Sequence, residues 1–264
     1  MESAILDLES PGSVDPSVLK GCQAVVHLAA RIPTHHDDMD EASLCCQVNS
    51  VGTLILIDAM GKAGVNRLIQ TTSANAYAPW AERPDEQAPM FPASRTYYLA
   101  SKIAQELYAN ARGLEVGVNV ATLRVSSVYG IESHRAAITV IARQMVEGGR
   151  VRLTAGGAFG ADFVTDEDVA QAILLLLETG ANGPFNVSSG TRSTLLEIAH
   201  QLARLTGTPS ERITVEDVDS HADPGFPAID NGKLKKLGFR PTPLDLGLQT
   251  LVNELRASAP NPVG

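Results

Sequence analysis

A tyrosine and a lysine four residues apart form the first pair in this chain whose types and spacing could do chemistry. They are Tyr98 and Lys102, in the stretch YYLASK at 97–102. On a helix, a spacing of four places both side chains on one face. A nearby ammonium favours the phenolate of a tyrosine and lowers its pKa from about 10, so the pair could act as an acid or base near neutral pH. The same spacing also occurs by chance, as an aromatic packing residue beside a solvated lysine.

A hydroxyl that could hold a substrate oxygen beside this pair ends an upstream strand. The apolar run VNRLIQTTS (65–73) reads as a buried strand that closes at Ser73. Parallel α/β sheets bind their ligands at the carboxyl edge of the strands. Ser73 is therefore the candidate for orienting the reacting hydroxyl.

Helices and strands alternate along the first half of the chain and would position these residues. The strand candidates are 3–8, 23–30, 65–73 and 119–130. The helix candidates are 40–63, 97–112, 136–148, 166–179, 194–206 and 244–256. This alternation predicts an α/β fold with a Rossmann-like, doubly wound parallel sheet. Beyond about residue 131 the order loosens, which predicts a small, mixed C-terminal lobe.

Composition narrows the classes of function. The 264 residues are 44% hydrophobic and 19% charged, as in a globular protein, and the net charge of −9 argues against a nucleic-acid binder. No continuous apolar run reaches the length of a membrane span, and no signal peptide is visible at the start. The odd number of cysteines, three, argues against a disulfide framework. A cytoplasmic protein that binds neither nucleic acid nor membrane is expected.

Several groups that could ligate a metal have simpler interpretations. His27 lies in an apolar strand and reads as a satisfied core histidine. We interpret Asp162, Asp166 and Asp168 as the start of a helix, where carboxylates suit the positive end. The polar cluster at 35–38 lacks the spacing of a defined ligand set and reads as a solvated loop. No metal site is expected.

Six segments resemble one known family in their order along the chain. They are VVHLAA (25–30), VNSVGT (48–53), TTSANAY (71–77), YYLASKIAQE (97–106), LRVSSVYG (123–130) and DFVTDEDVAQAI (162–173). Together they are similar to the NAD-dependent epimerase/dehydratase family of extended short-chain dehydrogenase/reductases. The resemblance runs from about residue 3 to residue 250. It implies a dinucleotide-binding domain over residues 1–150 and a mainly substrate-binding lobe over 151–264, interleaved with the first.

The resemblance also implies roles for individual residues. Ser73, Tyr98 and Lys102 would be catalytic, with Tyr98 preferred over Tyr97 because only Tyr98 has a lysine four residues on. The implied cofactor is NAD or NADP, with NAD favoured. Its contacts would be Asp7, Leu8, Leu28, Ala29, Ala30, Asn49, Thr71, Tyr98, Lys102, Val125 and Ser126. Substrate contacts would be Ser73, Asn75 and Ser127.

The implied activity is hydride transfer at a secondary alcohol or ketone of a sugar or nucleotide sugar. Two alternatives remain: an NAD(P)H-dependent reductase of a smaller carbonyl substrate, and a catalytically inactive, truncated member that acts as a binding module. The family resemblance also makes a homodimer a candidate assembly.

Two departures from the family pattern bear on these expectations. The family's Gly-x-x-Gly-x-x-Gly turn, which holds a pyrophosphate at a helix N-terminus, is absent upstream, and GGAFG (156–160) lies far down the chain. This predicts missing first strands, with a gap at the sheet centre or a rearranged edge. A start assigned too far downstream is the favoured explanation, with a degenerate fragment and a partner-supplied segment as alternatives. In addition, Ser127 and Ala161 stand where nucleotide-sugar enzymes often carry Asn and Arg, which favours a less charged substrate.

Overall fold

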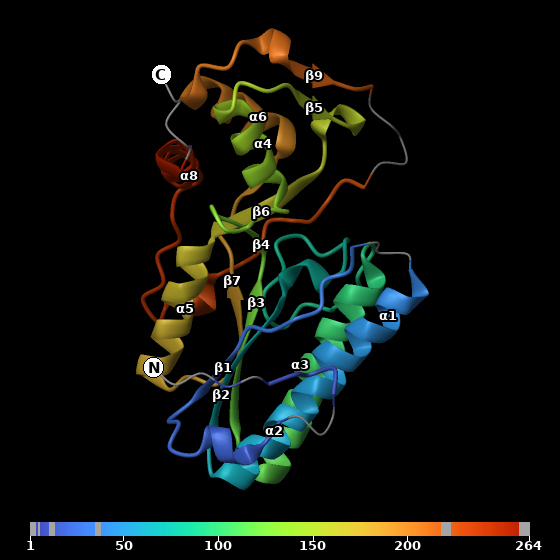
Figure 1. The fold of residues 1–264 in the computed structure, drawn as a ribbon, viewed down its shortest axis with the longest axis vertical. Helices are drawn as coiled ribbons and strands as arrows, with labels where there is room; N and C mark the ends of the chain where they lie inside the picture. Colours follow the sequence, from blue (N-terminus) through green and yellow to red (C-terminus); the bar gives the residue numbers. More distant parts are fainter. Residues whose placement is uncertain (1–3, 5, 11–13, 35–37, 218–222, 259–264) are drawn as a thin grey trace.

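A four-stranded parallel sheet forms the centre of the larger lobe (Figure 1). The structure, a computed structural model, describes residues 4, 6–10, 14–34, 38–217 and 223–258. The sheet has the order β1-β2-β3-β7, and all its neighbours run parallel. Its strands are β1 (Val25–His27), β2 (Arg67–Ser73), β3 (Asn119–Val125) and β7 (Gly183–Val187). The chain therefore has the predicted Rossmann-like α/β fold.

Helices cover both faces of this sheet, as a doubly wound fold requires (Figure 1). On one face, α2 (Gly52–Ala63) packs against the 21-residue α3 (Thr96–Val116), which contacts β2 and β3. Before α2 the chain runs through α1 (Met39–Cys45) and a π-helical stretch, Cys46–Val51. On the other face, α5 (Asp166–Thr179) packs against β2, β3 and β7.

The second lobe combines two small sheets with a group of three helices. One sheet has the order β4-β6-β8, and β5 pairs with β9 in the other. These strands are β4 (Ser127–Tyr129), β5 (Val151–Leu153), β6 (Gly160–Thr165), β8 (Arg192–Thr194) and β9 (Ile213–Val215). The helices are α4 (Ala137–Val146), α6 (Leu195–Thr206) and α8 (Leu244–Ser258), which pack on one another, and the short α7 (Gly232–Lys235) lies against β7. Both α5 and β7 follow residue 151, yet β7 is a strand of the larger sheet and α5 covers one of its faces. The two lobes are therefore interleaved in sequence.

Three expectations about local structure are wrong. The described residues of 3–8 form no strand; instead Leu8 is buried against α2, where Gly52 leaves room for its Cβ. The stretch 119–130 is not one strand, because β3 ends at Val125 and β4 begins at Ser127 in a different sheet. Asp162 lies on β6 and not at a helix start, and four hydrogen bonds from Ser189, Gly190 and Ile229 satisfy its carboxylate.

The predicted gap at the sheet centre is not seen among the described strands of the larger sheet, which form one continuous sheet with β1 at its border. Among the described residues, β1 pairs only with β2 and forms the border of the sheet. From β1 the sheet continues without interruption, because β2 pairs with β3 and β3 pairs with β7.

The helical stretch predicted at 40–63 lies at nearly those bounds, and it is more apolar over its whole length than its short continuous apolar runs indicated. By length and composition, Met39–Ala63 could cross a membrane, because α1, the π-helical stretch and α2 follow one another without interruption. In the structure, 56% of its most apolar window is buried within the fold, largely against α3. Its apolar character is that of a core helix.

Candidate active site

The ends of three parallel strands and the start of α3 meet at one edge of the larger sheet. Leu28–Ala30 follow β1, Ser73 ends β2 and Val125 ends β3. Since the strands run parallel, these residues share the carboxyl edge, where α/β sheets bind ligands. The first turns of α3 reach the same edge, because α3 contacts the turn Ala74–Ala76 that directly follows Ser73. The fold thus brings Ser73 and Tyr98 to one region.

Burial sets the chemistry of Tyr98 and Lys102. Burial raises the pKa of Tyr98 to about 12, and Cys45 adds to that rise. Burial also lowers the pKa of Lys102 to about 7. Lys102 is only 2% exposed, and its ammonium donates to the side-chain oxygen of Gln105. The structure therefore differs from the expectation that Lys102 lowers the pKa of Tyr98, because Lys102 is bonded elsewhere.

The cation that does act on Tyr98 is Arg95. Its guanidinium lowers the pKa of Tyr98, against the larger effect of burial. Arg95 precedes α3 with a φ of 51°, a left-handed conformation that is uncommon outside glycine. Its guanidinium carbon lies 5.5 Å from the ring centroids of both Phe159 and Phe226. No local pattern in the sequence points to Arg95, because the two rings come from the other lobe.

Asn49 joins the turn after β1 to α3. Its Oδ1 accepts from the backbone N–H of Arg31 at 2.7 Å, and its Nδ2 donates to the Arg31 carbonyl at 3.0 Å. Nδ2 also donates to Ser101 Oγ at 2.8 Å, and Ser101 Oγ donates to the carbonyl of Tyr98. Asn49 is fully buried, and its side chain bonds the backbone of Arg31 and the hydroxyl of Ser101. It holds the 28–31 turn in a fixed position relative to Tyr98.

Hydroxyl and amide groups link Ser73 to the second lobe. Ser73 Oγ accepts from the N–H of Asn75 at 3.2 Å. Asn75 Nδ2 donates in turn to Ser127 Oγ at 3.3 Å, at the start of β4. The three residues predicted to contact substrate therefore form one connected group.

The residues that could meet the nicotinamide end of a dinucleotide fit such a group. Ser126 Oγ is buried without a hydrogen-bond partner among the described residues, which a polar ligand would supply. Across the same edge, Leu28 is 54% exposed, and Ala29 and Ala30 are small and exposed. Val125 is buried at the end of β3. No glycine-rich turn precedes β1 in the described part of the chain, so the structure identifies no holder for a pyrophosphate.

The remaining predicted cofactor contacts lie in less informative places. Asp7 accepts from the N–H of Glu9 at 2.9 Å and from Ser10 Oγ at 3.1 Å, as a turn residue does. Leu8 is buried in the core beside α2. Thr71 is half-buried on β2, and its carbonyl accepts from Gln105 Nε2 at 3.4 Å. All of the predicted site residues are described, and their roles remain predictions.

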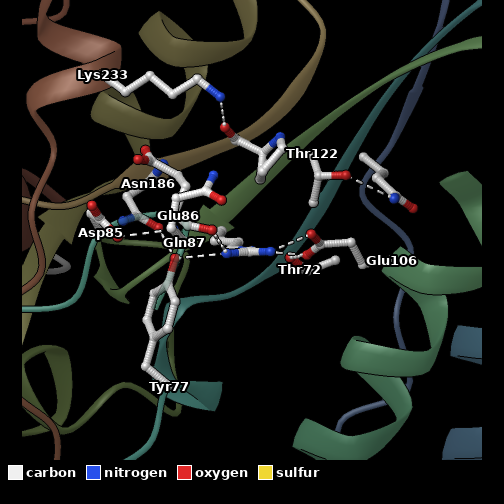
Figure 2. Close-up of polar contacts among 12 residues, drawn as sticks. Thr72, Tyr77, Asp85, Glu86, Gln87, Glu106, Thr122, Asn186 and Lys233 are labelled. Atoms are coloured by element: carbon white, nitrogen blue, oxygen red, sulfur yellow. Dashed lines mark hydrogen bonds and ion pairs between the residues drawn. The ribbon is translucent and has the colours of Figure 1, made fainter. Parts of the chain in front are cut away.

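A buried ion pair that sequence reasoning missed anchors α3 to β3. Arg124 donates to both carboxylate oxygens of Glu106, at 3.0 and 2.6 Å, and also to Tyr77 Oη at 2.9 Å. Figure 2 shows this group, with Asn186 accepting from Tyr77 Oη at 2.7 Å. Burial opposes the charge of Arg124, but its bonds to Glu106 outweigh burial and raise the pKa of Arg124. A signal was available: Glu106 lies one turn after Lys102 on the same helix face.

Groups with metal-ligating side chains have other partners. His27 Nε2 lies 3.0 Å from Thr53 Oγ1, and burial lowers the pKa of His27 to about 4, with Lys102 contributing. Asp166 begins α5 and Asp168 completes its capping box with Thr165. Among the described residues no group of three or more His, Cys, Asp or Glu side chains could hold a metal ion. Residues 35–37 of the polar cluster lie outside the described residues, and Asp38 caps α1.

Comparison with known sequences decides the family. Residues 3–188 match the NAD dependent epimerase/dehydratase family. The chain belongs to that family. Among its relatives, a UDP-glucose 4-epimerase of Mycolicibacterium smegmatis is 28% identical over 72% of this chain and 62% of its own length. A dTDP-glucose 4,6-dehydratase of Streptomyces niveus is 28% identical over 85% of this chain and 67% of its own length. The chain thus spans about two thirds of the length of these relatives.

Solved structures of the family have the same fold. A Thermus thermophilus UDP-glucose 4-epimerase in complex with NAD superimposes with a TM-score of 0.82. It is 25% identical, and the match covers 96% of this chain and 84% of that protein. A UDP-glucose 4-epimerase from Thermotoga maritima with UDP-glucose gives a TM-score of 0.79 at 26% identity, over 89% and 77% of the two chains. The Rossmann-like architecture is therefore that of nucleotide-sugar epimerases in the family.

Proposed function

We propose that this chain is an NAD(P)-dependent oxidoreductase of the epimerase/dehydratase type, with a nucleotide sugar as its substrate. The observation that carries this proposal is the shared sheet edge that holds Ser73, Tyr98 and Ser126, whose Oγ has no hydrogen-bond partner among the described residues. Relatives named as UDP-glucose 4-epimerase and dTDP-glucose 4,6-dehydratase support the substrate class. Structures of such enzymes with NAD support the cofactor, and NAD is favoured over NADP.

The chain's own residues divide the chemistry among them. Tyr98 moves a proton to or from the reacting hydroxyl, and Ser73 hydrogen-bonds the same oxygen. Lys102 would meet the ribose side of the dinucleotide, which would supply the hydride acceptor when bound. Leu28–Ala30 and Ser126 would contact the nicotinamide end. Asn75 and Ser127 orient the substrate between the two lobes, since their hydrogen bond crosses from the turn after β2 to β4.

The experiment is a coupled assay for interconversion of UDP-glucose and UDP-galactose with added NAD, run on the 264-residue chain and on Tyr98→Phe. A general acid/base contributes about 10²- to 10⁴-fold, so Tyr98→Phe should lose at least about a hundredfold in kcat. Tyr97→Phe is the matched control, since Tyr97 is partly exposed and lacks the lysine at +4. Undiminished turnover by Tyr98→Phe would exclude this mechanism. A dehydratase would instead release a 4-keto-6-deoxy sugar from dTDP-glucose, which absorbs after treatment with alkali.

A second candidate is a binding module without turnover. It is supported by the lack of a glycine-rich turn before β1 in the described residues. Calorimetric titration with NAD separates the two: the module predicts no heat of binding at millimolar NAD, and the enzyme predicts saturation. Measurable NADH consumption with a simple ketone, but no action on either nucleotide sugar, would favour the reductase of a smaller carbonyl substrate.

A further inference from the structure

Lys102 has an unusual environment for a lysine of an active site. It is 2% exposed, and it takes part in none of the ion pairs formed by the described residues. The side-chain acceptor of its ammonium is Gln105 Oε1, three residues further along α3. Lysine is almost never fully buried without a charged partner. A neutral amide therefore accepts the hydrogen bond from this buried lysine, where a carboxylate is the usual acceptor.

Gln105 is itself held by a chain of buried polar side chains. Its Nε2 donates to Gln70 Oε1 at 3.0 Å, and Gln70 Nε2 donates to Thr122 Oγ1 at 3.0 Å. Gln70 and Thr122 are direct cross-strand neighbours in the register of β2 and β3. Gln105 and Gln70 are fully buried, and Thr122 is 1% exposed. Figure 2 includes Thr122, the last side chain of this hydrogen-bonded series.

The protonated form of Lys102 fixes the direction of each hydrogen bond in this series. An ammonium can only donate, so while Lys102 is charged Gln105 must present its oxygen to Lys102 and its NH₂ group to Gln70. Gln70 must then present its own NH₂ group to Thr122. Both amide dipoles consequently point their negative ends towards the ammonium, and successive bonds of this kind polarise one another. Flipping either amide would place two donors face to face.

We propose that Gln105, supported by Gln70, is a positioning residue for Lys102: it holds the ammonium at a fixed place beside the candidate cofactor site. The proposal rests on the proposed function only in giving Lys102 a role in turnover. The hydrogen-bonded chain to the sheet can be tested without turnover.

The charged groups around Lys102 leave this role to Gln105. On β1, His27 is held neutral because burial lowers its pKa to about 4. On α3, Glu106 is occupied by Arg124 of β3, and the phenol of Tyr98 is uncharged at neutral pH because burial raises its pKa to about 12. Burial favours the neutral form of Lys102 and lowers its pKa to about 7, so the group is still partly charged at neutral pH.

The test is an NMR titration of the Lys102 side chain in the cofactor-free protein, followed at Cε and Nζ after isotope labelling. Gln105→Met keeps the length of the side chain and removes the acceptor. A hydrogen bond to a charged group is worth enough to move a pKa by about one unit, so the pKa of Lys102 should fall by about one unit in Gln105→Met. Gln105→Glu should raise it by at least as much, and Lys102→Met identifies the resonance.

Two further variants separate a relay from a simple packing effect. Gln70→Met leaves the Gln105 oxygen that accepts from Lys102 but removes the hydrogen bond between Gln105 and Gln70. It should therefore lower the pKa of Lys102 as Gln105→Met does, by a smaller amount. Gln144→Met, at an exposed position of α4, should leave the titration unchanged. A pKa of Lys102 that is the same in Gln105→Met, Gln105→Glu and the unsubstituted protein would overturn the proposal. Loss of folding in Gln105→Met alone leaves the Gln105→Glu and Gln70→Met arms to decide.

Turnover distinguishes failure of this inference from failure of the proposed function. If the pKa of Lys102 shifts as expected but the protein binds no NAD and converts no nucleotide sugar, the role of Gln105 is supported and the proposed enzyme activity is refuted. If the protein turns over a nucleotide sugar but the pKa of Lys102 does not shift, the enzyme activity is supported and the role of Gln105 is refuted. With both intact, Gln105→Met should raise the KM for NAD more than it lowers kcat, with partial recovery in Gln105→Glu.

Discussion

Asn49 holds Arg31 by both of its backbone polar groups, with its oxygen accepting from the N–H at 2.7 Å and its nitrogen donating to the carbonyl at 3.0 Å. A single side chain thereby does for the turn after β1 what a neighbouring strand does elsewhere in the sheet. The turn has no other described strand beside it. Asn49 therefore holds the backbone of the turn, while Glu41 binds the Arg31 guanidinium and Cys45 Sγ makes a weaker contact with the Arg31 carbonyl at 3.6 Å.

Replacing Asn49 should loosen this turn selectively. In Asn49→Leu the N–H of Arg31 loses its partner and the carbonyl keeps only the weaker contact from Cys45 Sγ, and each group left unsatisfied costs about 1–3 kcal/mol when buried. We expect a loss of about 2 kcal/mol in the free energy of unfolding and faster hydrogen exchange at the Arg31 amide. Asn253→Leu, on the exposed side of α8, is the control and should change neither. Slow exchange of Arg31 in Asn49→Leu would contradict the role given to Asn49.

The buried pair of Arg124 and Glu106 should be far more sensitive to substitution than a surface pair. Their side chains are 7% and 5% exposed, and Glu106→Gln leaves the guanidinium without its counter-charge. Removing one partner of such a pair costs about 3–5 kcal/mol, to be measured by urea unfolding. The control Asp58→Asn breaks a pair with Arg112 whose side chains are 41% and 37% exposed, and should cost less than about 1 kcal/mol.

A double variant tests whether the cost comes from the uncompensated charge. Arg124→Met combined with Glu106→Met removes both charges and fills the space with apolar atoms, an exchange that is often neutral in other proteins. It should therefore be more stable than Glu106→Gln alone. A double variant that is less stable than the single one would show that the bonds of Arg124 to Tyr77 and to the carbonyl of Glu86 dominate instead.

Lys102 should make stability depend on pH above neutrality. Its folded pKa of about 7 lies below the ordinary 10.5, so in this interval the unfolded chain binds a proton that the folded chain does not. The free energy of unfolding is therefore highest with respect to Lys102 above the unfolded pKa. It decreases as the pH falls towards 7, by up to about 1.4 kcal/mol per pH unit. Lys102→Met should flatten the rise in unfolding free energy between about pH 7.5 and 9.5. The exposed Lys62→Met should keep it.

Arg95 should influence the pH dependence of turnover through Tyr98. Because its guanidinium lowers the pKa of Tyr98, Arg95→Met should move the alkaline limb of kcat/KM, which reports groups of the free enzyme, to higher pH. Arg95→Lys keeps a positive charge and should move it less. Arg204→Met, an exposed arginine on α6, is the control. A limb that stays in place in Arg95→Met would remove Arg95 from the site.

Sequence reasoning placed the elements well and their partners less well. Tyr98 and Lys102 were predicted on one helix face because a spacing of four is a local property. Lys102 instead bonds Gln105, and Gln105 depends on Gln70, which lies 35 residues earlier on β2. Such a partner is fixed by strand register and by how α3 docks on the sheet, and neither can be read from a local pattern.

The errors in strand assignment have the same origin. The run at 3–8 is apolar enough for a strand, but an apolar run forms one only where a neighbour can pair with it, and Leu8 finds a helix instead. The run at 119–130 is continuous in its apolar character, and nothing in LRVSSVYG shows that the chain changes sheets after Val125. Arg95 was missed because its stacking partners, Phe159 and Phe226, belong to distant segments.

The change of sheet at Ser126 has a mechanical consequence. The N–H of Ser126 still donates to the carbonyl of Val187, the last residue of β7, whereas Ser127 is already in register with Phe163 of β6. One residue, about 3.3 Å of backbone, therefore separates the last pairing of the larger sheet from the first pairing of the β4-β6-β8 sheet. The chain also crosses between the lobes from β6 into α5 and from β7 to β8, so the short joint at Ser126 keeps the ends of β3 and β4 at a nearly constant separation during any relative movement of the two lobes.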